Sequence, residues 1–110
     1  MKAIILISEA SLPLAKTLQG ELKDALIYTK NEWEGCISIA SYHRFMEEHF
    51  NDFESIIFIG ALGICVRSMA GCLTNKYKDP AVVCVDSTGR FVISVLSGHV
   101  GGANELTRHI

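Results

Sequence analysis

The run Ser55–Ile59 constrains the fold of this chain more than any other segment. It is apolar and mostly β-branched, a composition that favours a strand buried on both faces of a sheet. The run ends at a glycine-containing turn, Gly60–Gly63, and the pattern after it predicts a helix from about Ile64 to Leu73. A strand that leads through a turn into a helix indicates an open α/β sheet, in which ligands bind beyond the carboxyl ends of the strands. The Gly60–Gly63 turn is therefore a candidate binding site.

The first half of the chain shows the same alternation of strand and helix. Lys2–Ile7 is a short β-branched run that predicts a buried strand. The next residues predict a helix with Ser11 as its N-cap and Pro13 in its first turn. Apolar residues recur there at helical spacing at Ala15, Leu18, Leu22 and Leu26. The other elements expected in this half are strands at Leu26–Thr29 and Cys36–Ala40 and a helix that begins after Ser41 and ends near Asp52.

The second half adds a hairpin and a final helix. Ala81–Val85 and Phe91–Val95 are apolar runs separated by a reversal that contains Asp86 and Gly89, so they predict an antiparallel pair. The loop Ser97–Gly102 then leads into a helix expected from about Ala103. Together the elements predict an α/β fold, a three-layer α/β/α arrangement with a mainly parallel sheet and one antiparallel hairpin. The length of 110 residues suits one domain, residues 1–110.

Charge and hydropathy exclude several classes of protein. The formal net charge is −2 and the chain has no basic run, so it lacks the electrostatic footprint of a nucleic-acid-binding protein. Its longest apolar stretch, Ile56–Val66, is too short to span a bilayer and is broken by glycines. The apolar start reaches Ser8 and Glu9 too soon for a secretory signal. We expect a cytosolic, cytoplasmic protein with no membrane partner, and its last helix runs to Ile110 without a stop signal, as in a piece of a longer protein.

No metal site is indicated by the residues that bind metals most often. The cysteines have neither zinc-site nor redox spacing, and in a cytosolic chain they are interpreted as small reduced core residues. They are Cys36, Cys65, Cys72 and Cys84. His49 lies on the apolar face of its expected helix and is interpreted as a packing residue, because no other ligand type is spaced to join it.

The loop after Ser97 has the composition of a catalytic or anion-binding segment. Gly98, Gly101 and Gly102 surround His99 and let a ligand approach the main chain closely. Because a helix is expected just after them, their N–H groups would face an anion or a developing oxyanion. His99 titrates near neutral pH when unperturbed and is the candidate general base or acid. The alternative is a structural turn in which His99 only fixes the loop.

Residues around this loop are candidates for supporting roles. Glu105 either orients His99 in catalysis or caps the last helix, and Asn104 either contacts substrate or caps. Arg67, early in the helix after Gly63, can hold a substrate carboxylate in a bidentate manner, or it pairs with Asp79 or Asp86 at the surface. Lys76 is a weaker binding candidate with a solvated surface as its alternative, and Asp86 is a turn former first. We expect the Gly60–Gly63 turn and the Ser97–Gly102 loop to lie side by side.

These residues also resemble, in order and spacing, the N-terminal domain of the cobalt-precorrin-5A hydrolase family of cobalamin biosynthesis, known as CbiG. One departure is Gly71-Cys72, where the family pattern has an Ala-Pro-Leu-like helix end; another is the absence from this chain of the family's separate C-terminal domain. The resemblance rests on Gly63, Val66, Arg67, Lys76, Asp79, Pro80, Ala81, Val82, Asp86, Gly89, Ser97, Gly98, His99, Gly101, Gly102, Ala103, Asn104 and Glu105.

The resemblance implies a hydrolase that opens the δ-lactone ring of cobalt-precorrin-5A and releases acetaldehyde. It implies a cobalt-corrinoid substrate and the missing C-terminal domain as partners, and no protein cofactor, because the substrate carries the cobalt. The fragment alone is expected to be inactive. In this interpretation His99 and Glu105 are catalytic. The substrate-binding residues are Gly60, Gly63, Arg67, Lys76, Gly98, Gly101, Gly102 and Asn104.

Two other functions stay open from the sequence. The domain can be a non-catalytic tetrapyrrole-binding module of a larger or fused enzyme, or a generic anion or nucleotide binder. The nucleotide interpretation loses ground because the chain has no phosphate-loop motif and no dinucleotide-binding glycine pattern after its first strand. A serine-hydrolase elbow is also missing, since Ser97 lacks the flanking pattern.

Overall fold

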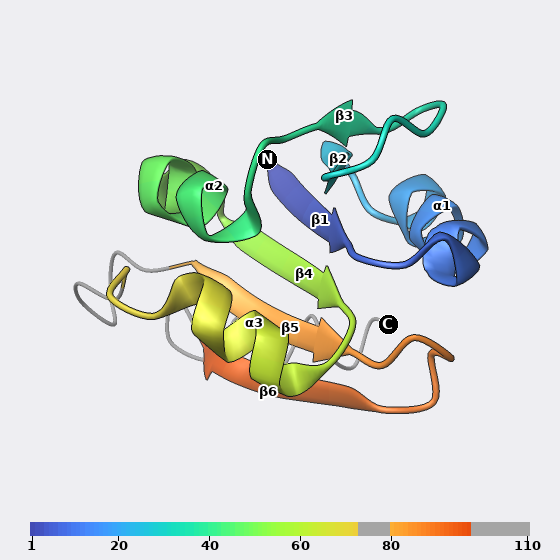
Figure 1. Ribbon diagram of the computed structural model, residues 1–110. Helices are drawn as coiled ribbons and strands as arrows, with labels where there is room; N and C mark the ends of the chain where they lie inside the picture. The colour runs from blue at the N-terminus through green and yellow to red at the C-terminus, as the bar shows by residue number, and fades with distance from the viewer. Residues whose placement is uncertain (73–79, 98–110) are drawn as a thin grey trace.

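The computed structural model describes residues 1–72 and 80–97, and within them strands and helices alternate (Figure 1). Short 3₁₀ turns precede α1 at Glu9–Ser11 and follow α2 at Phe50–Asp52. The final helix expected from Ala103 lies outside the described residues. The elements are β1 (Lys2–Leu6), α1 (Leu12–Glu21), β2 (Ala25–Thr29), β3 (Ile37–Ser38), α2 (Tyr42–His49), β4 (Ser55–Ile59), α3 (Leu62–Met69), β5 (Ala81–Val85) and β6 (Val92–Ser97).

The described strands form one mixed sheet in the order β3-β2-β1-β4-β5-β6. Every neighbouring pair is parallel except β5 and β6, which pair antiparallel. A register shift between Val82 and Val83 interrupts the β5–β6 ladder. The predicted mainly parallel sheet with one antiparallel hairpin is therefore confirmed.

Helices cover both faces of the sheet, which gives the predicted three layers (Figure 1). On one face α1 packs Ala15 and Leu18 into a core cluster with Ile4, Ile57 and Val83. On the other face α2 and α3 contribute a second cluster, which contains Phe45, Met46, Cys65 and Met69. β1 and β4 lie between these layers, so their side chains are buried whichever face they point to.

Burial on both faces explains why Ser55–Ile59 was the strongest signal in the sequence. The side chains of Ile56 through Ile59 are all 0% exposed, and successive residues enter opposite core clusters. A strand in this position has no solvent face and therefore carries no alternating polar residues. Within residues 1–72 and 80–97, no helix is both long and apolar enough to cross a membrane.

The start of α1 differs from the expected capping by Ser11. The chain enters α1 through the 3₁₀ turn, so the capping side chain is Ser8, whose hydroxyl accepts from the Ala10 N–H at 3.2 Å. The Ser11 hydroxyl makes no cap and donates instead to the carbonyl oxygen of Ser87 at 3.2 Å. Ser11 is thus a buried tie between α1 and the β5–β6 hairpin. The cap expected at Ser41 is confirmed, since its hydroxyl accepts from the Arg44 N–H at 3.3 Å.

α3 begins and ends earlier than the expected Ile64–Leu73. It starts at Leu62, directly after the turn, and its last residue is Met69. Gly71 has φ +84°, a left-handed conformation that favours glycine and is common just after a helix C-terminus. The Gly71-Cys72 pair therefore ends this helix, and Leu73 lies outside the described residues.

Candidate functional site

The turn after β4 is built around Gly60, where any other residue would be strained. Its φ is +157°, and a Cβ added there would lie 3.1 Å from Cγ1 of Ile7. The Gly60 N–H donates to the carbonyl oxygen of Val85 at 2.9 Å, so the turn is tied to the end of β5. Gly60 thus holds the main chain at the carboxyl edge of the sheet, where the sequence predicted a binding turn.

Two cysteines lie beneath this turn as neutral thiols. Cys65 and Cys84 are both buried, and the Cys84 thiol donates to the carbonyl oxygen of Gly60 at 3.3 Å. Burial is the main cause that raises the pKa of Cys65 to about 12, and burial also raises the pKa of Cys84. The nucleophilic form of cysteine is the thiolate, so these side chains support the turn rather than react.

No disulfide bond joins the cysteines within the described residues. Cys65 and Cys84 are core residues, whereas Cys36 and Cys72 are only partly buried. In the described part of the chain, no group of three or more His, Cys, Asp or Glu residues could hold a metal ion.

The position of Gly63, unlike that of Gly60, leaves space for a side chain. It lies in the first turn of α3, is exposed, and has no heavy atom within 4 Å of the place where a Cβ would be. The N-cap of α3 is Ala61, which provides no side-chain hydrogen bond. First-turn N–H groups without a side-chain cap suit an anionic ligand, so a binding role for Gly63 stays a prediction.

Arg67 does not lie early in its helix, as the sequence suggested, but in the last turn of α3. The reason is the earlier start and end of α3 described above. Its side chain is exposed and has no ion-pair partner within residues 1–72 and 80–97. The alternative pairing with Asp86 is therefore not observed, and Asp79 lies outside the described residues. Arg67 remains available as a predicted carboxylate-binding residue, at the far end of α3 from Gly60.

Asp86 is a turn former, as expected. One carboxylate oxygen accepts from the Phe91 N–H at 3.0 Å and the other from the Thr88 hydroxyl at 2.7 Å. The Phe91 hydrogen bond, with further help from Thr88, holds the pKa of Asp86 below its usual value. Gly89, at φ +77°, completes the reversal by donating its N–H to the Asp86 carbonyl oxygen at 2.9 Å. The carboxylate is thus occupied by the hairpin itself.

We expected the Gly60–Gly63 turn and the Ser97–Gly102 loop to lie side by side. This prediction is wrong for Ser97, the one residue of the loop that the structure describes. Ser97 pairs with Ala81, and Ala81 pairs with Ser55, the first residue of β4. Because β6 runs antiparallel, its carboxyl end lies at the amino edge of β4 and β5, opposite Gly60. The loop residues after Ser97 lie outside the described residues.

The same geometry places Ala81 and Ser97 opposite each other at the amino edge of the sheet. In the sequence, Lys76 precedes Ala81 and His99 follows Ser97. α3 starts at the opposite edge and runs back along β5, so its last turn, with Arg67, points toward this amino edge (Figure 1). Lys76, Gly98, His99, Gly101, Gly102, Asn104 and Glu105 themselves lie outside the described residues, and their roles stay predictions.

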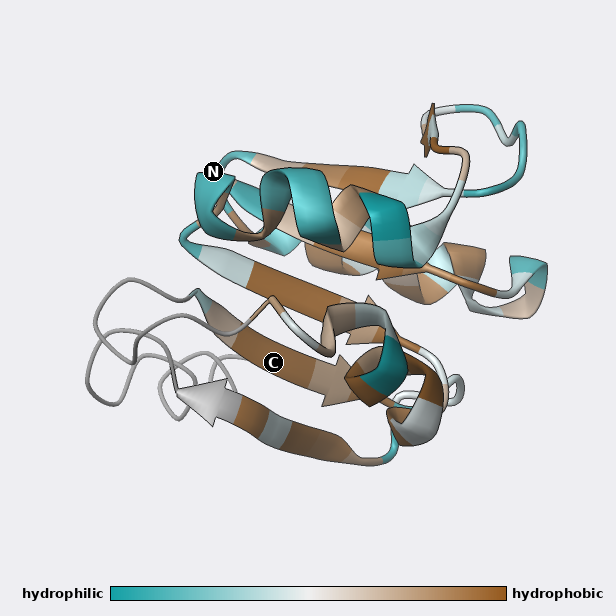
Figure 2. Ribbon diagram, turned by 60° about the vertical axis from the view of Figure 1, so that its left-hand side comes forward, coloured by the Kyte–Doolittle hydropathy of each residue, from teal (hydrophilic) through white to brown (hydrophobic). Residues whose placement is uncertain are grey.

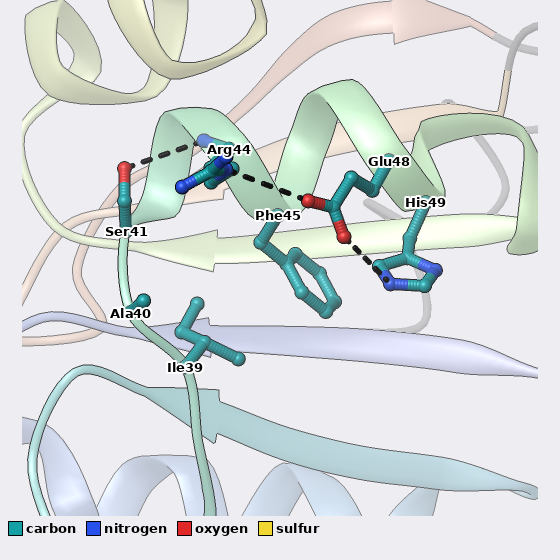
Figure 3. A pocket seen from close by; sticks show the side chains of 7 residues that line it. All are labelled: Ile39, Ala40, Ser41, Arg44, Phe45, Glu48 and His49. Atoms are coloured by element: carbon teal, nitrogen blue, oxygen red, sulfur yellow. Dashed lines mark hydrogen bonds and ion pairs between the residues drawn. The ribbon is translucent and has the colours of Figure 1, made fainter.

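A groove beside α2 contains none of the predicted site residues. It has a volume of about 160 Å³ and is lined by residues of α2 and the segment before it (Figure 3). Its cationic side chain, Arg44, lies 3.6 Å from Glu48. His49 lies 2.9 Å from Asp52, and its ring is tilted by 43° against that of Phe45, with ring centroids 5.2 Å apart. These contacts agree with His49 as a packing residue. The groove is a shallow surface feature whose charges are already paired.

The described residues form an α/β domain with a single sheet. The Gly60 turn lies at the carboxyl edge of the parallel strands, and Ser97 lies at their amino edge. Comparison with known proteins identifies its family. A model of the family described as "Cobalamin synthesis G N-terminal" matches residues 44–110, more than half of the chain. The chain belongs to this family.

Comparisons with individual proteins agree with this assignment. The chain is 39% identical to the cobalt-precorrin-5A hydrolase of Salmonella typhimurium and 34% identical to that of Priestia megaterium, in each case over 98% of the chain. It spans only 31% of each of these relatives. A crystal structure of a cobalamin biosynthesis protein G homolog from Sulfolobus solfataricus superposes with a TM-score of 0.75 at 28% identity, covering 97% of this chain and 32% of the other.

Proposed function

We propose that this chain is the N-terminal part of a hydrolase that opens the δ-lactone of cobalt-precorrin-5A and releases acetaldehyde. The observation that carries the proposal is the similarity, over nearly the whole chain, to two proteins named cobalt-precorrin-5A hydrolase. Cobalt belongs to the proposed substrate, so the proposal needs no metal or cofactor held by the protein, and it keeps the cytoplasmic location expected from the sequence. The rest of the hydrolase is taken to follow these residues in a complete polypeptide.

The proposed chemistry is attack of water on the lactone carbonyl. His99 takes a proton from the water, Glu105 orients the imidazole, and N–H groups of Gly98, Gly101 and Gly102 stabilise the oxyanion. Hydrolysis adds the hydroxyl of water to the carbonyl carbon and returns the proton to the ring oxygen, which opens the lactone. The freed hydroxyl gives up its proton as the carbon–carbon bond to the macrocycle breaks, so the two-carbon unit leaves as acetaldehyde and the macrocycle carbon, which keeps the electron pair, takes up a proton.

Substrate carboxylates are the proposed targets of the cationic residues. A corrinoid with acidic side chains needs positive groups around it, and the chain as a whole has a net charge of −2. Ala81 and Ser97, the described residues nearest in sequence to Lys76 and His99, pair at the amino edge of the sheet, and α3, with Arg67 in its last turn, runs toward that edge. This arrangement supports a substrate site there, with Asn104 as a further contact. The Gly60–Gly63 turn, at the opposite edge, is the weaker part of the proposed substrate site.

A second candidate is a non-catalytic module that only holds the macrocycle. The observation that favours it is that 31% of each hydrolase is matched, so the rest of the protein has room for the whole catalytic site. In this version His99 contacts substrate but transfers no proton.

The test compares His99→Asn with His49→Asn in the complete polypeptide. His49 is a histidine of α2 with its own partners and serves as the matched control. We expect His99→Asn to lose acetaldehyde release by about 10²-fold or more, the size typical of a general base, while corrinoid binding changes little. Full turnover in His99→Asn would overturn the catalytic role and favour the binding module.

A further inference from the structure

Exposed large apolar side chains gather on one side of the domain. Within the described residues they are Met1, Ile37, Leu62, Ile64, Val66, Phe91 and Ile93. All except Met1 and Ile37 lie on α3 or at β6. Single exposed apolar residues need no explanation, but a cluster marks an interaction surface.

Leu62, Val66, Phe91 and Ile93 form what we call the α3–β6 face. Ile93 pairs with Cys84, whose side chain is in the same core cluster as Cys65 and Met69 of α3, so Ile93 points to the α3 side of the sheet. Phe91 directly precedes β6, two residues before Ile93, and is the most exposed of the four residues. Leu62 and Val66 are four residues apart and share a flank of α3. The four side chains are 41%, 45%, 66% and 44% exposed.

The four side chains of the α3–β6 face are uncharged, and their charged neighbours in sequence are Arg67 on α3 and Arg90 before β6. The outward side of α2 carries Glu47 and Glu48 and is hydrophilic, whereas β6 and part of α3 are hydrophobic (Figure 2). β6 contains no charged residue and forms an edge of the described sheet. Exposed edge strands normally carry charges or other features that block further pairing, and interface cores are depleted of charge and enriched in aromatic residues.

We propose that the α3–β6 face packs against the part of the complete polypeptide that follows these 110 residues. The matched relatives are about three times longer than the chain, since it spans 31% of each. The family model is described as N-terminal, so in family members the remaining part comes after this region. β6 is the last described strand and borders the face. This inference goes beyond the proposed reaction and does not depend on which residues are catalytic.

The first measurement compares backbone hydrogen exchange in the complete polypeptide and in the chain that ends at Ile110. We expect amides of α3 and of residues 91–97 to exchange about tenfold or more slowly in the complete polypeptide. Amides around Ile37 on β3, the opposite edge of the described sheet, are expected to exchange equally in both. Equal exchange of α3 and β6 in the two proteins would overturn the proposal.

Paired variants identify the side chains responsible. In the complete polypeptide, the double variant Val66→Ser with Phe91→Ser should lose the extra protection, while Ile37→Ser, 42% exposed on β3, should keep it. Because all three side chains are already exposed in the chain alone, folding of the domain should change little. Protection that survives the double variant contradicts the proposal. Sedimentation of the chain that ends at Ile110 adds a check: a stable dimer with the same protection would assign the face to self-association and overturn the proposal.

Discussion

Substitution of Gly60 by alanine should destabilise the domain, whereas the same substitution at Gly63 should not. At Gly60 an L-residue must adopt φ +157°, and its Cβ would lie 3.1 Å from Cγ1 of Ile7 and 3.4 Å from Cε1 of Phe58. A non-glycine residue in such a conformation costs about 1–3 kcal/mol. At Gly63 no atom lies within 4 Å of the added Cβ, and the residue is helical. Alanine there should stabilise by up to about 0.5–1 kcal/mol.

The assay is thermal and urea unfolding of the chain that ends at Ile110, with both variants and the parent side by side. For a domain of this size, about 1–3 kcal/mol corresponds to a Tm lower by roughly 5–15 °C in Gly60→Ala. Gly63→Ala should show an equal or slightly higher Tm. The reasoning is refuted if Gly60→Ala is as stable as the parent, or if the two variants lose the same stability.

Three further predictions concern individual side chains. Glu54 lies 2.8 Å from the Nζ of Lys2, which holds its pKa below the usual value; the pair should contribute about 0.2–1 kcal/mol. Because the folded pKa is lowered, this stability is present above the unfolded pKa and lost as pH falls through the folded pKa, so the loss of Tm in Glu54→Gln should be greatest at pH 7 and should shrink as pH falls below the ordinary value of 4.5. With the other cysteines replaced, Cys65 and Cys84 should react with a thiol reagent only at the rate of unfolding; rapid labelling of the native chain would show that they are accessible. Asp86→Ala should lower Tm and speed hydrogen exchange of the Phe91 amide, which donates to the Asp86 carboxylate. An unchanged exchange rate of that amide would contradict the role of Asp86 in the hairpin.

Much of the fold could be predicted because burial on both faces leaves a direct trace in the sequence. Ser55–Ile59 and Ala81–Val85 were predicted with the bounds that the structure shows, since strands without a solvent face are continuous apolar runs. Helix ends were harder to predict. Ser11 has the chemistry of an N-cap, but a hydrogen bond to the distant Ser87 takes its hydroxyl. Such tertiary contacts leave no local pattern.

The sequence named individual candidate site residues, whose roles stay predictions, and the arrangement expected for two of the segments was wrong at Ser97. The Gly60–Gly63 turn and the loop after Ser97 each follow an apolar strand, which suggested one shared edge. The antiparallel hairpin, itself predicted, reverses β6 and places Ser97 at the opposite edge. The direction of β6 could thus be predicted from the sequence. Applied consistently, it predicts that the Gly60–Gly63 turn and Ser97 lie at opposite edges of the sheet. The position of Arg67 depended on where α3 begins and ends, which local propensity does not fix.

The most direct test of the proposed function is acetaldehyde release from the lactone of cobalt-precorrin-5A, measured for the complete polypeptide and for the chain that ends at Ile110. The complete polypeptide should release acetaldehyde in step with lactone opening. The shorter chain should fold yet release little or none, because a macrocycle needs a larger pocket than one small domain offers and pockets favour domain interfaces. Comparable turnover per mole from the shorter chain would place the whole active site within these residues. No release from the complete polypeptide would contradict the proposed reaction.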